Sequence, residues 1–237
     1  MRVPQPPAVS KRPLLIFCVV VGVVLFWYFA RVKTIICTVD SQPCSEEVSA
    51  QLRSIHGQQI VGVDVQTAAK KALSEQPVTV LSLKKRLPST VYIMLQSQPF
   101  QYAVASAETV RPVTTVGTLY TVPAPTKLVQ IAVTPDVLQS ALQEEKHLQP
   151  EIHTALTATA AYVQSLDEKP ARIELLDTTS IRITMKSGAK ILLPVAKNAE
   201  SLVQLGMILT APEYARLQSE YTEIDLRFKL PVLRKSQ

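Results

Sequence analysis

Residues 78–97 read "VTVLSLKKRLPSTVYIMLQS", and this stretch decides the fold of the N-terminal half. Two runs rich in β-branched and apolar residues flank a turn at Pro88 and Ser89, and such residues are typical of turns between strands. In the second run Val91, Ile93 and Leu95 share one face, because successive side chains in a strand alternate. The pattern therefore predicts two paired strands with one buried face.

The segments before this strand pair predict one more strand and two helices. Residues 32–39, "VKTIICTV", form a β-branched run typical of a strand. Residues 45–57 and 64–76 carry apolar side chains at helical spacing, and they begin at the capping residues Ser45 and Asp64. The order strand, helix, helix, strand, strand predicts a helix pair laid on one face of a small sheet.

The C-terminal half predicts a mixed or antiparallel β domain with flanking helices, so the fold class is α+β. Strand and turn patterns occupy 118–133, and two or three antiparallel strands are expected within 171–195. Helices are expected over 135–148, 150–166 and 198–209, the first two opened by a proline.

The N-terminal segment predicts a short cytoplasmic tail over residues 1–12 and a transmembrane helix over 13–31. Residues 14–30 carry no charge and would form about 26 Å of helix, the short end of what spans a bilayer. An aromatic cluster near the end of this segment suits the headgroup region. The residues expected to contact lipid are Leu14, Val21, Trp27, Tyr28 and Phe29.

Basic residues before this segment predict its orientation. Arg2, Lys11 and Arg12 precede it without any acidic residue, so we expect a single-pass type II protein of the inner (plasma) membrane with its bulk outside the cytoplasm. A cleaved signal peptide is the alternative. Cleavage after Ala30 would place the bulky Tyr28 where small residues are preferred, which favours an uncleaved segment.

Two of the three cysteines are disulfide candidates. Cys37 and Cys44 lie in "CTVDSQPC", just after the apolar segment. In an oxidising compartment they could close a small loop, and two unpaired thiols are the alternative.

The composition argues against several classes of function. The net charge is +6, the cations are dispersed and aromatics make up only 5%, which argues against a nucleic-acid partner. No glycine-rich phosphate loop, nucleophile elbow or metal-ligand spacing is present. We therefore expect no enzyme, no cofactor, no metal and no small-molecule substrate; an envelope enzyme built on paired carboxylates stays a minor alternative.

Residues 78–104 resemble the end of a POTRA domain in the bacterial cell-division family FtsQ, called DivIB in Gram-positive bacteria. Residues 85–88, "KRLP", match the basic-Leu-Pro turn, and Pro99 matches a later proline, whereas Gln98 stands where the family often has Glu. Residues 223–228, "EIDLRF", are similar to the family's terminal signature. Residues 187–209 are similar to its glycine hairpin and leucine-rich helix.

The resemblance implies a POTRA domain over 32–105 and a C-terminal β domain over 106–237. It also implies a non-catalytic scaffold of the division septum that holds the coiled-coil proteins FtsB (DivIC) and FtsL, works with other division proteins and helps control septal peptidoglycan synthesis. A POTRA-containing secretion or envelope-assembly factor is the alternative, although such chains usually carry several repeats.

The terminal segment is the candidate partner-binding site. An edge strand offers unpaired N–H and C=O groups to which a partner strand can add. We expect residues 224–233 to form or flank such an edge, with Phe228 as the main anchor because aromatic residues dominate binding hot spots. The alternative makes Leu226 and Phe228 ordinary core residues and Arg227 part of a surface salt bridge. The candidate residues are Ile224, Leu226, Arg227, Phe228, Lys229, Leu230 and Val232.

Overall fold

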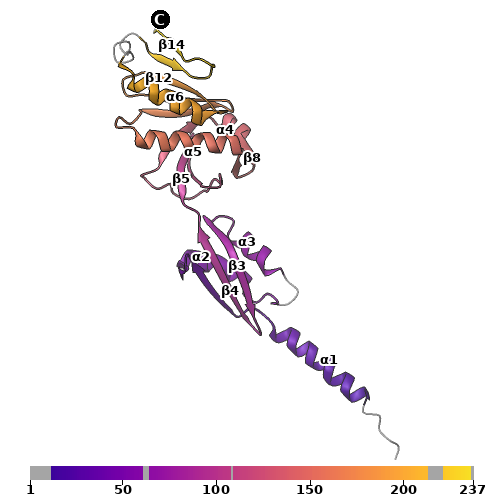
Figure 1. The fold of residues 1–237 in the computed structure, drawn as a ribbon. Coiled ribbons are helices and arrows are strands. Elements are labelled where there is room, and N and C mark those ends of the chain that lie inside the picture. The colour runs from indigo at the N-terminus through magenta and orange to yellow at the C-terminus, as the bar shows by residue number, and fades with distance from the viewer. Residues whose placement is uncertain (1–11, 61–63, 108, 213–220, 236–237) are drawn as a thin grey trace, which may run out of the picture. The chain divides into compact units, whose positions relative to one another are not determined.

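The computed structural model describes residues 12–60, 64–107, 109–212 and 221–235 (Figure 1). The chain divides into two compact units, Met1–Ser97 and Gln98–Gln237. Each unit combines helices with its own principal sheet. We describe each unit by itself.

The first unit contains a four-stranded sheet in the order β2-β1-β4-β3. β1 runs parallel to β4, and β3 pairs antiparallel with β4. The order strand, helix, helix, strand, strand occurs as expected, with a two-residue strand added after the first. The elements are α1 (Arg12–Phe29), β1 (Thr34–Val39), β2 (Gln42–Pro43), α2 (Glu46–Leu52), the 3₁₀ helix η1 (Arg53–Ile55), α3 (Val65–Ala72), β3 (Val78–Arg86) and β4 (Thr90–Ser97).

Capping and apolar spacing explain the helices of this unit. The hydroxyl of Ser45 accepts a hydrogen bond from the Val48 amide, and the Asp64 carboxylate accepts bonds from the first-turn amides of α3. The apolar faces of both helices are buried with the alternate residues of β4. These core residues include Val48, Leu52, Val65, Ala69, Val91, Ile93 and Leu95.

The predicted transmembrane helix is wrong. Across the described residues no helix is both long enough and apolar enough to cross a membrane. α1 ends at Phe29, and the next residues belong to the globular core: Ala30 and Val32 are buried, and they bond through their backbones to Ile60 and Gln58. The end of the predicted span is therefore part of the folded unit.

The residues proposed as membrane contacts all lie within α1. Val21 and Tyr28 are exposed on it. The predicted cytoplasmic tail, residues 1–12, lies outside the described residues apart from Arg12. The remaining proposed contacts, placed on α1 by the backbone, are Leu14, Trp27 and Phe29.

The second unit contains an eight-stranded mixed sheet in the order β14-β13-β12-β11-β10-β7-β5-β6. α5 and α6 contact each other, and buried residues of both belong to one core with the sheet. The elements are β5 (Phe100–Ser106), β6 (Thr109–Thr114), β7 (Val129–Val133), α4 (Pro135–Ala141), β8 (Leu142–Glu144), β9 (His147–Leu148), α5 (Pro150–Ser165), β10 (Arg172–Asp177), β11 (Ser180–Thr184), β12 (Lys190–Pro194), α6 (Asn198–Thr210), β13 (Glu223–Asp225) and β14 (Val232–Arg234).

Two expectations for this half differ from the structure. The boundary expected at 105/106 would place β5 in the first domain, but β5 pairs with β6 and β7 in the second sheet, and the two units divide between residues 97 and 98. The helix expected over 135–148 ends at Ala141 and gives way to the β8–β9 hairpin. Leu148 is buried, and its amide donates a hydrogen bond to the Gly117 carbonyl. These contacts are made by residues 142–148 in the extended conformation and not in a helix.

Candidate partner-binding edge

The terminal segment forms a hairpin and not the single strand expected over 224–233. β13 lies parallel to β12, and β14 returns antiparallel along the other side of β13. Glu223 is opposite Arg234 and Asp225 is opposite Val232. The chain's own backbone therefore covers β13, and the outermost strand of this sheet is the short β14.

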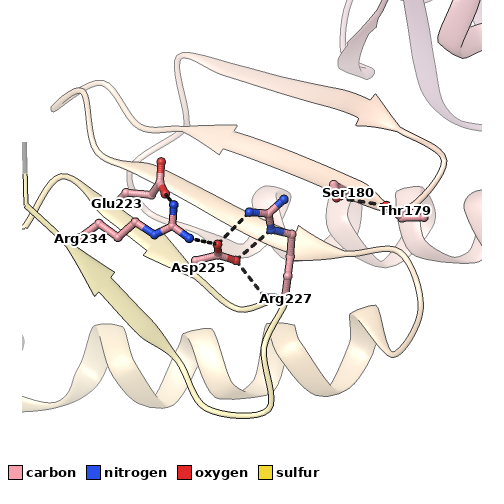
Figure 2. A network of polar contacts seen from close by, with 6 residues as sticks. All are labelled: Thr179, Ser180, Glu223, Asp225, Arg227 and Arg234. Carbon is pink, nitrogen blue, oxygen red and sulfur yellow. Dashed lines mark hydrogen bonds and ion pairs between the residues drawn. The ribbon is translucent and has the colours of Figure 1, made fainter.

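A buried carboxylate explains why the chain turns after Asp225 (Figure 2). The side chain of Asp225 is fully buried, and its Oδ1 accepts hydrogen bonds from the backbone amide (3.1 Å) and the Nε (2.9 Å) of Arg227. Its Oδ2 accepts from Arg227 Nη2 at 2.8 Å and from Arg234 Nη2 at 3.0 Å. Because a buried charge is tolerated only when it is paired and bonded, these contacts fix the turn.

The electrostatics of this cluster follow from the same contacts. The hydrogen bond from the Arg227 side chain is the main cause that lowers the pKa of Asp225 below its ordinary value. In turn, the bond to Asp225 raises the pKa of Arg227. Arg234 also lies 3.4 Å from Glu223 through Nη1 and Oε1. The two arginines therefore join β13, the turn and β14.

The candidate residues divide into a buried and an exposed group. Ile224 and Leu226 are 2% exposed and belong to the hydrophobic core, so they present no surface to a partner. Phe228 is 54% exposed and Leu230 is 76% exposed. Lys229 and Val232 are also exposed, and Arg227 is partly exposed while bonded to Asp225. The alternative of an ordinary core residue holds for Leu226 but not for Phe228.

A cavity of about 470 Å³ adjoins this turn, and Arg227 and Phe228 form part of its wall. Thr179 and Ser180 also line the cavity, and their hydroxyl oxygens lie 3.3 Å apart (Figure 2). The cavity lies at the ends of β11, β12 and β13, and no residue of β14 lines it. The other lining residues are Glu151, Thr178, Pro194, Val195 and Ala196.

Sequence patterns did not single out the other residues that line this cavity, because they come from segments far apart in the chain. A signal for the buried cluster did exist. Asp225 occupies a polar position in the alternating segment 223–230 and is followed by two arginines, Arg227 and Arg234, with Pro231 between them. This combination is consistent with a charged residue buried at a turn.

The opposite edge of the same sheet is covered by the chain itself. On β6, the carbonyl of Pro112 accepts a bond from the Tyr120 amide at 3.0 Å, and the Thr114 amide bonds to the Thr118 carbonyl at 3.0 Å. Pro112 also has no amide hydrogen to donate. Strand addition at β6 is therefore disfavoured relative to β14.

Two observations concern cysteines and candidate metal ligands. Cys37 and Cys44 are joined by a disulfide, with their Cα atoms 5.5 Å apart. In the part of the chain that the structure describes, no group of three or more His, Cys, Asp or Glu is arranged to hold a metal ion.

The comparisons with known proteins add no relatives. No family model matches this chain, and a search of curated proteins finds no match either.

Proposed function

We propose that this protein is a non-catalytic scaffold that holds a partner polypeptide by strand addition at β14. The observation that carries the proposal is the end of the second sheet. There the three-residue outer strand begins with the exposed Val232, and the turn before it carries the exposed apolar residues Phe228 and Leu230. Free backbone groups provide the hydrogen bonds of an added strand, and apolar side chains provide its affinity.

The buried cluster supports this role because it makes the edge rigid. Asp225, Arg227 and Arg234 hold the hairpin in one conformation before any partner arrives. A preformed edge loses less conformational entropy on binding than a segment that must first become ordered. The protein would thus present β14 as a fixed template.

We further propose that the partners are FtsB (DivIC)- and FtsL-like coiled-coil proteins at the bacterial division septum. The sequence resemblance of residues 78–104 and 223–228 to the FtsQ/DivIB family supports this choice. The disulfide between Cys37 and Cys44 supports a location outside the cytoplasm, since disulfides persist in oxidising compartments.

A binding experiment tests the docking surface. In the double variant Leu230→Lys/Val232→Lys, two exposed apolar side chains beside the edge become charged, and we expect capture of the FtsB-like partner to fall at least roughly tenfold. The control is Val203→Lys, which charges an exposed apolar residue on α6, away from the edge strand. Equal capture by the double variant and the control would refute docking at β14.

Depletion in cells tests the biological role. We expect filaments without septa when the protein is depleted. Normal division combined with defective export of envelope proteins would instead support the alternative, a secretion or envelope-assembly factor.

A further inference from the structure

The disulfide of the first unit closes a very short hairpin. β1 and β2 share only two residue pairs, Thr38 with Pro43 and Val39 with Gln42. Between them, Asp40 and Ser41 have φ values of 49° and 70°, a left-handed conformation that non-glycine residues rarely adopt. A hairpin this small, with such a turn, is marginal by itself. The cross-link between Cys37 and Cys44 therefore holds its conformation.

The tip of this hairpin contacts the last residue of the first unit. The Asp40 amide donates to the Leu95 carbonyl at 3.0 Å. The Ser97 amide lies 3.3 Å from Asp40 Oδ1 and 3.4 Å from Oδ2, and the Ser97 hydroxyl donates to Oδ2. The carboxylate thus takes the place of a further strand residue beside the end of β4.

Ser97 ends the first unit, and Gln98 begins the second. β1 follows β4 in parallel register only as far as Val39 opposite Leu95. Beyond that pair, the carboxylate of Asp40 holds the backbone of Ser97. Ser97 also lies opposite Val78 of β3, so the Asp40 carboxylate supplies its contact on the β1 side of β4.

We infer that the Cys37–Cys44 disulfide is a redox-controlled clamp on the end of β4, the last strand of the first unit. With the bond closed, Asp40 is held against Ser97, and the connecting segment starts at Gln98. With the bond open, the hairpin loosens and Ser97 loses the carboxylate on its β1 side, while its pairing with Val78 of β3 remains. This inference concerns the first unit and does not depend on the proposed partner.

The chemical step is a thiol–disulfide exchange with an external dithiol. The dithiol's thiolate attacks one sulfur of the bond, which forms a mixed disulfide and releases the first cysteine thiolate. The second thiol of the reductant then displaces the other cysteine. Cys37 and Cys44 end as two thiols, and the reductant, a dithiol of the oxidoreductase class, ends as a disulfide.

Hydrogen exchange on the full chain tests the clamp. The background is Cys18→Ser, so that Cys37 and Cys44 are the only thiols. We expect the Ser97 amide to exchange roughly tenfold faster after reduction with dithiothreitol, because it loses a hydrogen bond to a charged acceptor. Amides in the centres of β3 and β4 should keep their rates.

Two variants separate the carboxylate from the cross-link. Asp40→Gly keeps the left-handed backbone and the disulfide but removes the carboxylate, so it should accelerate Ser97 exchange to the same extent, with no further effect of reduction. Ser41→Gly, the matched control at the neighbouring left-handed residue, should leave Ser97 unchanged. An unaffected Ser97 after reduction or in Asp40→Gly would overturn the clamp. Faster exchange spread throughout β3 and β4 would also overturn it, because the bond would then stabilise the whole unit.

Discussion

The guanidinium of Arg227 donates two hydrogen bonds to the carboxylate of Asp225, from Nε to Oδ1 at 2.9 Å and from Nη2 to Oδ2 at 2.8 Å. The Asp225 side chain is fully buried, whereas that of Arg227 is one-third exposed. Only Leu226 separates them in sequence. The pair lies at the start of the turn that leads from β13 to the outer strand β14.

Removal of the Arg227 guanidinium should destabilise the second unit. In Arg227→Gln the buried carboxylate keeps only the Arg234 side chain as a charged partner, so we expect a loss of about 2–4 kcal/mol in the free energy of unfolding. Urea denaturation measures it. The control is Lys229→Gln, an exposed cation of the same turn, whose effect should stay within about 0.5 kcal/mol. Equal midpoints for the two variants would contradict the structural role of Arg227.

Stability should fall at acid pH through Asp225. The pKa of its carboxyl in the folded protein lies below the ordinary value of 3.8, chiefly because Arg227 donates to it. The unfolded chain therefore binds a proton more readily, so the contribution of Asp225 is complete above about pH 5 and is lost as pH falls through the folded pKa.

Denaturant midpoints measured from about pH 6 to pH 2 test this dependence. Asp225→Asn should be less stable than the parent at pH 6, and its midpoint should fall less steeply in acid. Asp64 and Asp177 also have lowered pKa values and leave a residual slope in both proteins. Parallel curves for parent and variant would show that Asp225 does not contribute.

Local signals in the sequence predict the first unit well. Val91, Ile93 and Leu95 are all buried in β4, as alternation within the strand indicates. Ser45 and Asp64 cap the helices that they were expected to open. Each of these features depends on residues a few positions apart. Such spacing is visible in the sequence before the three-dimensional structure is known.

Features that depend on distant residues could not be predicted in this way. The alternation across 224–233 is the same for one long strand and for a hairpin, and the difference lies in Arg234, nine residues beyond Asp225. Likewise β5 has a clear strand pattern, but its parallel neighbour is β7, more than twenty residues away. The pattern gives the strand but not the sheet that it joins.

Substitution of Phe228 should weaken partner capture without changing the stability of the protein. Its side chain is 54% exposed, so Phe228→Ala should change the free energy of unfolding by less than about 0.5 kcal/mol. Capture of the FtsB-like partner should weaken by about 2 kcal/mol if Phe228 anchors the added strand. Leu226→Ala is the contrasting variant, because Leu226 is buried and should cost about 2–5 kcal/mol of stability. Unchanged capture by a folded Phe228→Ala protein would remove Phe228 from the interface.

Gly117 should tolerate a side chain less well than Gly188. Both have φ near +80° to +90°, so alanine pays the left-handed cost of about 1–2 kcal/mol at either position. A Cβ at Gly117 would lie 3.2 Å from the His153 ring, whereas nothing lies within 4 Å at Gly188. The His153 ring cannot move freely, since its Nε2 donates to the Thr115 carbonyl at 3.1 Å and its Nδ1 accepts from the Tyr102 hydroxyl at 3.0 Å. We therefore expect Gly117→Ala to lose about 1–3 kcal/mol more than Gly188→Ala in urea denaturation. Equal losses of unfolding free energy in the two variants would mean that the His153 ring moves aside without destabilising the protein.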